Sequence, residues 1–477
     1  MAADEDNVEN STSDDDDEVD IGQALDKLED ILEDDDGLWT KISQDHLDEL
    51  LLEHDRHMDG FLGAKRATLK FFDMSYLDFN GCNLTQADAT GARFEHASME
   101  DAIFMAGNFY AADMRFVSFM GSNLTRADLR GACLRGADFT DANLTEADLR
   151  DGLLMKSVER GEIVPVMNEM EAAAIDQAIM KGTDLTNARM SNAFVVQTDM
   201  TDAILRNARF IRADLSFANF TGAILDGADF TEANLTGAVF HGAVLTHTIL
   251  DNAILDKANL SGAIIESVNM NNVDIGQARM PRHVAKLDRE IKDIIADHVK
   301  WQNSDGKEGQ QANLSEVNLG GYDLRETNLA AADMSYCILK NADLSKGNFM
   351  MTDFCFADMR NANLNSANLS GAKLQRTNLA GANLVGAQFE GLPSDEHGGL
   401  WPANLQFVKL RGAKLNGVNF TNANLEGADL CKADLRNADL RGAKLVDADL
   451  TEADLGGAKL KGADLRGAKG LDTSPLL

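Results

Sequence analysis

Histidine has the most direct chemical potential in this chain, because an imidazole can bind a metal or transfer a proton near neutral pH. Nine histidines occur, and only His54 and His57 have a helical metal-ligand spacing, as a zinc site on one helix face would require. A matching segment downstream has His298 followed three residues later by Trp301. We interpret both segments as structural caps, each of which closes one end of a repeat module. This role accounts for both pairs, so we expect no metal and no cofactor.

The other reactive groups do not form a recognisable catalytic set. The five cysteines are odd in number and widely spaced, which fits neither a disulfide framework nor a zinc site; they are Cys82, Cys133, Cys337, Cys355 and Cys431. No glycine-rich phosphate loop stands out from the many turn glycines. An enzyme needs groups that converge on one point. We therefore predict a protein that is not an enzyme and has no catalytic residues.

The elements that carry these side chains are defined by a five-residue period. Over most of the chain every fifth residue is Leu, Phe or Met, and a small residue, usually Ala, stands two positions before it. The stretch ANLEGADLCKADLRNADLRGAKLVDADL (Ala423 to Leu450) shows the pattern. A period of five matches neither a helix nor a strand. It indicates a solenoid, whose units bury their apolar faces against their neighbours. We call the large apolar residue of each unit the centre.

Interruptions of this period divide the chain. The repeat stops at an insertion that contains a helical pattern over 169–180, ends at Pro281, restarts after a second helical pattern over 284–295, and is interrupted once more. The helix, histidine, ring and glycines before the first repeat recur before the second, as caps should. The predicted division is an acidic disordered tail with a short amphipathic helix (1–36), a helical cap (37–66), a first repeat module (67–280, insertion 155–181), a second cap (281–311), a second module (312–469, insertion 390–403) and a tail (470–477).

Runs such as ADLRGACLRGADFTDANLTEADL (Ala127 to Leu149) resemble the pentapeptide-repeat family, whose unit is A-(D/N)-L-x-x. The resemblance implies an all-β solenoid, a right-handed quadrilateral parallel β-helix, here with short α-helical caps and insertions. One pentapeptide would form each side, with about twenty residues per coil. The centre and the preceding Ala would point inward, and the other three positions would face solvent. Asp or Asn before the centre suits a tight turn, where its side chain can bond nearby backbone.

Outward aromatic residues are the candidate partner-binding surface. Residues twenty apart should lie above one another, and each of these rings follows its centre by two positions; they are Tyr76, His96 and Phe116 in the first module and Tyr336 and Phe356 in the second. Contiguous exposed apolar groups often mark binding surfaces. Two interpretations stay open: the rings bind a partner, or they only stack on one another or lie beneath caps or insertions.

The charge restricts the partners. The formal net charge is -34, and residues 1–36 hold 17 acidic residues against one basic residue. Such a chain should repel nucleic acid and anionic membranes, so we expect protein partners with basic surfaces. No apolar run has the length of a membrane span, and the acidic N-terminal segment is unlike a secretory signal. We expect a cytoplasmic protein.

Three functions fit these features. The first is a non-enzymatic scaffold or adaptor for protein–protein interaction, since solenoids offer large surfaces. The second comes from the resemblance: some family members mimic DNA and bind DNA gyrase or related topoisomerases. The last block argues against this second function, because residues 405–469 hold 11 basic and 9 acidic residues. The third is a secreted effector. The sequence favours the scaffold.

Overall fold

The fold is known from a computed structural model of the 477-residue chain. The structure describes residues 39–152, 155–157, 163–165, 174–284, 287–393 and 400–471. The predicted acidic tail with its short helix, and residues 472–477 of the C-terminal tail, lie outside the described residues.

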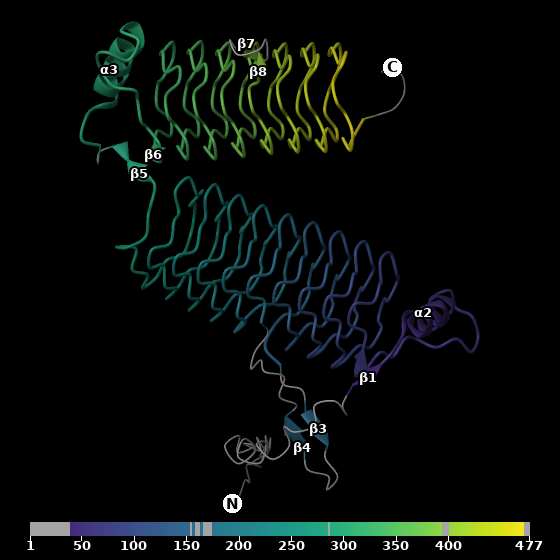
Figure 1. The fold of residues 1–477 in the computed structure, drawn as a ribbon. Coiled ribbons are helices and arrows are strands. Elements are labelled where there is room, and N and C mark those ends of the chain that lie inside the picture. The colour runs from purple at the N-terminus through teal and green to yellow at the C-terminus, as the bar shows by residue number, and fades with distance from the viewer. Residues whose placement is uncertain are drawn as a thin grey trace, which may run out of the picture.

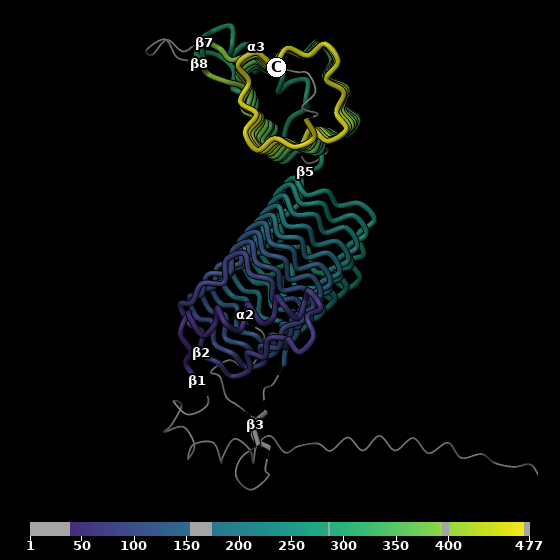
Figure 2. Tube along the Cα trace, turned by 90° about the vertical axis from the view of Figure 1, so that its right-hand side faces the viewer, coloured from purple at the N-terminus to yellow at the C-terminus, as the bar shows by residue number. Residues whose placement is uncertain are grey.

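The repeats form parallel β-helices with four sides and twenty residues per coil. Single bridging residues recur every five positions, and each pairs in parallel with the residue twenty positions later, as in Asp113–Cys133, Ser118–Asp138 and Asn123–Asn143. Leu205 N donates to Ile224 O over 2.7 Å, and Ile224 N donates to Ala203 O over 2.9 Å. The second stack, seen nearly end-on, has a four-sided outline (Figure 2).

Each side is so short because a turn follows every centre. The second residue after the centre adopts a left-handed conformation, as at Asn207 with φ 54°, which favours Gly, Asn and Asp there. The Asp or Asn before the centre completes the turn. Both Thr85 N and Thr85 Oγ1 donate to Asn83 Oδ1, over 3.1 and 2.7 Å. The predicted role of these polar residues in the turn is confirmed.

The centres and the small residues before them fill the interior. Leu205 and Ala203 are fully buried, and this pattern holds along both stacks. Aromatic centres lie face to face from coil to coil, as in Phe210 and Phe230 with ring centroids 4.9 Å apart and planes at 3°. Because alanine is small, a large centre from each side can meet the others inside one narrow coil.

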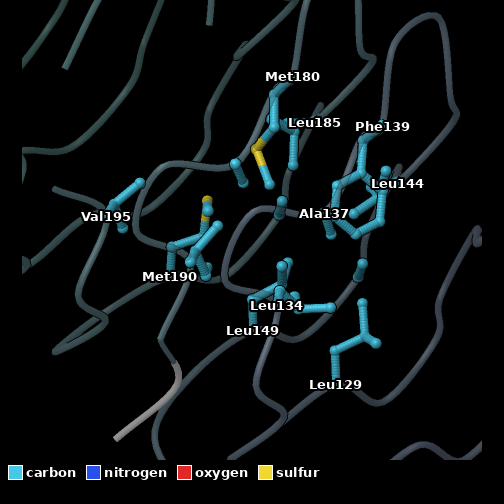
Figure 3. Packing of buried hydrophobic residues seen from close by; sticks show 14 of the residues in the cluster. Leu129, Leu134, Ala137, Phe139, Leu144, Leu149, Met180, Leu185, Met190 and Val195 are labelled. Carbon is cyan, nitrogen blue, oxygen red and sulfur yellow. The ribbon is translucent and has the colours of Figure 1, made fainter. Parts of the chain in front are cut away.

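The first insertion is shorter than expected. It contains a hairpin in which β3 (Met155–Ser157) pairs antiparallel with β4 (Ile163–Pro165). The predicted helix over 169–180 is wrong for residues 174–180, because Ala174 pairs with Cys133 and Ile175 and Met180 are buried centres. The alanines that favour a helix also fit the small inward positions, and packing decides between the two. Figure 3 shows side chains from both sides of the insertion, such as Leu134 and Met190, within one core.

The second insertion holds a similar hairpin. Strand β7 (Leu392–Pro393) pairs antiparallel with β8 (Leu400–Trp401). The repeat continues directly past it, since Gln388 pairs in parallel with Asn419.

Each stack begins with a strand and a helix. In the first cap, β1 (Thr40–Lys41) precedes α2 (Gln44–Met58) and pairs in parallel with β2 (Phe72–Asp73) of the first coil. In the second, β5 (Arg282–His283) precedes α3 (Ile291–Asn303) and pairs with β6 (Val317–Asn318).

The helix predicted over 284–295 is wrong in its limits. Val284 and Leu287 precede α3 and pack against the second core, and the helix itself continues to Asn303. Apolar residues at helical spacing therefore serve two different elements here.

Two hydrophobic cores result, one from Ile42 to Ala263 and one from Ile291 to Leu450. We call the two stacks the first β-helix (residues 67–280) and the second β-helix (residues 312–469). They run in opposite directions, approach each other at the β5 and β6 end, and diverge toward α2 and the C-terminus (Figure 1).

The inward assignment of the centres can be tested at Leu205. Replacing this fully buried residue by Asp should lower the free energy of unfolding by about 3–5 kcal/mol, because it buries an unpaired charge. The control Glu232→Ala changes an exposed turn residue and should stay within about 0.5 kcal/mol. Denaturant unfolding measures both. Equal tolerance of the two changes would show that the centres do not point inward.

Candidate protein-binding surfaces

The cap histidines are built into the backbone. His298 Nδ1 accepts a hydrogen bond from Ala312 N at 3.0 Å, and its Nε2 lies 3.0 Å from Ala330 O. His54 Nδ1 accepts from Ala67 N, also at 3.0 Å. Both side chains are fully buried. Each histidine thus ties the end of its cap to the start of the first repeat.

The residue three positions later stacks on each histidine. The rings of His298 and Trp301 lie 5.5 Å apart at 15°, and those of His54 and His57 lie 6.4 Å apart at 24°. His57 Nδ1 contacts Ala64 O at 3.2 Å. Nδ1 of His54 therefore bonds the backbone of the first repeat, and the ring of His57 stacks on the same histidine.

Many carboxylates are likewise occupied by the fold. In the recurring sequence Asp-Leu-Arg, the arginine folds back onto the aspartate two positions before it. Arg436 Nε and Nη2 donate to Asp434 Oδ1 and Oδ2 over 2.8 and 2.7 Å. The bond from Arg436 is the main reason that the pKa of Asp434 falls to about 2. Asp434 is therefore ionised at neutral pH and serves as a fixed acceptor for Arg436.

One group in the second β-helix has metal-ligand chemistry but holds an arginine. Asp429, Cys431 and Asp449 lie close enough to share an ion. Arg411 Nε donates to Asp429 Oδ2 over 3.1 Å, and its Nη1 lies 2.9 Å from Cys431 Sγ. The guanidinium supplies the positive charge at this point, so the group is an ion pair.

The three outward rings of the first β-helix form one ladder. Tyr76 and His96 stack with centroids 5.2 Å apart at 17°, and His96 and Phe116 stack at 5.0 Å and 12°. Tyr76 is 73% exposed and Phe116 48% exposed. Below Phe116 the next coil has Gly136, where an added Cβ would lie 2.6 Å from the ring. We call Tyr76, His96 and Phe116 the ring ladder; its edges face solvent.

The structure places the second aromatic pair differently. Tyr336 and Phe356 stack on each other at 5.2 Å and 5°, but both are half-buried. His241 of the first β-helix lies 4.6 Å from the Tyr336 ring, and a Cβ on Gly262 would lie 3.0 Å from Phe356 O. The rings point out of their own coil, and the first β-helix covers them. Of the two interpretations left open by the sequence, stacking beneath a neighbouring element describes this pair, although the element is the first β-helix and not a cap or an insertion.

Charged residues surround this contact between the β-helices. Glu266 Oε1 accepts from both Lys340 Nζ and Arg360 Nη2, each at 2.8 Å. Further along, Arg376 pairs with Asp202, and Lys409 Nζ donates to Gly222 O over 3.1 Å. In these three contacts the second β-helix supplies the cations and the first supplies the acceptors, whereas Arg279 of the first pairs with Glu316 of the second. Sequence periodicity alone placed these residues outward but had no signal for the facing stack.

The comparisons with known proteins agree with this architecture. The profile of the family described as pentapeptide repeats matches residues 65–157, 178–280, 311–349, 352–391 and 403–469, which is more than half of the chain. The chain therefore belongs to the pentapeptide-repeat family, and membership implies that its four-sided β-helix is right-handed. Among curated protein sequences, none matches this chain.

Several solved pentapeptide-repeat structures resemble it. HetL of Nostoc, involved in regulating heterocyst differentiation, is 23% identical, with 75% of this chain and 92% of that chain covered and a TM-score of 0.18. A protein of the Arabidopsis thaliana thylakoid lumen is 28% identical over 25% of this chain and 77% of its own, with a TM-score of 0.17. A trypsin-treated form of QnrB1, a plasmid-mediated fluoroquinolone resistance protein, is 18% identical over 44% and 92%, with a TM-score of 0.20.

Among the residues that the structure describes, no helix has both the length and the apolar character needed to cross a bilayer.

The buried histidines of the two caps should make the stability of the folded protein depend on pH. Burial lowers the pKa of His54 and of His298 below the ordinary 6.5. The folded state therefore favours the neutral ring, and the caps contribute fully above about pH 6.5. Their contribution is lost as the pH falls through the lowered pKa values. The thermal midpoint of the wild type should drop as the pH is lowered below about 6.5.

The variant His298→Asn keeps an acceptor near the position of Nδ1 but does not titrate, so its midpoint should depend less on pH in this range. The exposed residue His46 serves as the control, and His46→Asn should keep the slope of the wild type. An unchanged slope in His298→Asn would mean that the cap does not require a neutral histidine.

Proposed function

We propose that this protein is a non-enzymatic scaffold that binds other proteins through outward columns of its first β-helix. The ring ladder carries the proposal. Three stacked rings with exposed edges form a rigid, partly apolar strip, and burying such a strip against a partner costs little side-chain entropy. Exposed apolar groups that are contiguous, as these are, tend to mark binding sites.

The placement of the reactive groups supports a non-enzymatic role. The cap histidines bond backbone amides, and the aspartates before the centres bond turn amides and arginines. Side chains that serve the fold in this way are not available for proton transfer. The protein would act by presenting surfaces.

Two further features belong to the proposal. The five cysteines are free thiols, which fits the reducing cytoplasm.

A DNA-like acidic rod fits less well, because basic residues outnumber acidic residues in the last block, 11 to 9 over residues 405–469. We therefore propose protein partners that bind the first β-helix, and we do not favour a role as a DNA mimic.

The ring ladder is tested by the double variant Tyr76→Ala with Phe116→Ala. We expect proteins that co-purify with the wild type to be lost or reduced about tenfold or more, since central aromatic residues dominate binding energies. Quantitative mass spectrometry of the purified complexes measures this.

The matched control is Phe217→Ala. Phe217 occupies the same position of the repeat, is 57% exposed and lies over Gly237, but belongs to no ladder. Co-purification should survive this change. If the double variant keeps every partner of the wild type, the ring ladder is not a binding surface.

A further inference from the structure

A column of aspartates runs along the corner of the first β-helix that faces the second. Successive bridges connect the coils of this side, from Ser98 through Asp138 to Asp199. Between Asp101 and Asp202 every second coil has an aspartate in the left-handed turn position, and each carboxylate lies over a glycine of the next coil; the column then continues with Gly242 and Gly262. The three pairs are Asp101 over Gly121, Asp141 over Gly182 and Asp202 over Gly222. We call these aspartates the aspartate column.

One member of the column already binds an arginine. Arg376 Nη1 of the second β-helix pairs with Asp202 Oδ2, and the two side chains are only 21% and 31% exposed. The glycine in the next coil matters here, because a side chain at Gly222 would clash with Asp202 and lie 3.5 Å from Arg376 Nη1. The column thus provides a carboxylate with open space on the next coil, into which a guanidinium fits.

The other two members have the same setting without the arginine. Asp101 and Asp141 are exposed, and within the described residues neither carboxylate forms a hydrogen bond or an ion pair. The second β-helix diverges from the first along this part of the corner, as Figure 1 shows. The hairpin of β3 and β4 extends on the side away from the second β-helix, so it leaves this corner open.

Over its first four coils the side next to the column carries acidic charge alone, and the following coil adds Lys181, which pairs with Asp199 at 3.3 Å. Over these four coils the side consists of residues 77–81, 97–101, 117–121 and 137–141, and lies between the ring ladder and the aspartate column. These residues include five carboxylates and no lysine or arginine. None of the five forms an ion pair in the described part of the chain; Glu100, for example, only accepts from Ser118 Oγ at 2.9 Å. By contrast, arginines on the preceding side are paired, such as Arg115 with Asp113 at 2.7 Å.

We propose that Asp101 and Asp141 form a docking site for an arginine-bearing segment of a partner protein, which continues the contact that Asp202 makes with Arg376. The inference rests on the proposed scaffold function and names the partner's chemistry. Continuity with the contact between the two β-helices supports it, and so does the unpaired negative charge of the adjoining side. Arginine suits the site better than lysine, because its planar fork can bond a carboxylate in two places.

The spacing of the column indicates the shape of the segment. Coils are about 4.8 Å apart, so carboxylates two coils apart are separated by about 10 Å. In a polyproline II segment, residues three apart lie on one face at a distance of about 9 Å. A segment with arginine at every third position therefore matches Asp101 and Asp141.

The experiment measures binding of labelled peptides to the full-length protein by fluorescence anisotropy. The main peptide has two arginines separated by two prolines within a proline-rich segment. One comparison peptide has the arginines adjacent, one has lysines in their place, and one is a helical peptide with arginines seven residues apart. We expect the main peptide to bind most tightly and the lysine and adjacent-arginine peptides to bind several-fold more weakly.

The double variant Asp101→Asn with Asp141→Asn should weaken binding of the main peptide about tenfold or more. The matched control is Glu232→Gln with Asp256→Asn, which removes the same charge at outward residues of the first β-helix away from this side. It should bind like the wild type. Thermal unfolding of both variants establishes that each is folded.

Three results would overturn the proposal. Equal weakening by both double variants would show unspecific attraction to an acidic protein, and binding weaker than about 1 mM would show that no docking site exists. Tightest binding of the helical peptide would contradict the extended segment. If no peptide binds, but the double variant Tyr76→Ala with Phe116→Ala still loses its co-purifying proteins, the arginine docking site is wrong and the scaffold function stands.

Discussion

The hydrogen bonds between coils, repeated every twenty residues, are the constraint on which the rest of this structure depends. Because Leu205 N bonds Ile224 O and the same pattern recurs on every side, each residue lies directly beneath its counterpart in the next coil. Like side chains then interact along the axis. Phe220 and Phe240 stack at 5.0 Å inside, and Asn348 Nδ2 donates to Asn328 Oδ1 over 2.9 Å outside. Side chains twenty residues apart therefore form columns along the axis of each β-helix, and neighbouring members of a column interact.

The outward side chains of one column can stabilise the fold or contact another surface. A glycine in the next coil leaves the space that such a contact needs. Phe116 can lie flat because Gly136 follows it one coil later, and Asp202 can meet Arg376 because Gly222 does. The second β-helix contacts this corner of the first over several coils, from Gly262, which lies against Tyr336 and Phe356, to Asp202, which pairs with Arg376. The same corner then continues past the point where the stacks diverge. The contact of Asp202 with Arg376 is the basis on which we propose a guanidinium as the group that Asp101 and Asp141 bind.

Much of the fold could be predicted from the sequence, because inward positions repeat strictly. Leu205 and Ala203 are recognisable as buried from the period alone, and His298 was recognisable as a cap residue from its likeness to His54. The strands β1 and β5 have only two residues each, which is too short for a sequence pattern to predict them. Ile175 and Met180 were assigned to a helix because alanine-rich segments satisfy both patterns.

The candidate surface was harder to predict than the fold. Periodicity shows that Tyr336 and Phe356 point away from their own coil, but it contains no information about where a second stack lies. Their burial depends on how two separate stacks pack, which is set by contacts such as those of Glu266 with Lys340 and Arg360. For Tyr76 and Phe116 the same periodicity was sufficient, because no described element covers them.

We propose that columns of the first β-helix recognise basic groups through their aspartates, and reversing the charges of the pair Asp202 and Arg376 tests this recognition within the chain. Small-angle X-ray scattering of Asp202→Arg and of Arg376→Asp should each show a larger radius of gyration, because like charges then face each other across the contact. The double variant, which restores an opposite pair, should return to the dimensions of the wild type. Unchanged dimensions in the single variants, or a double variant that stays open, would show that Asp202 and Arg376 do not hold the two stacks together.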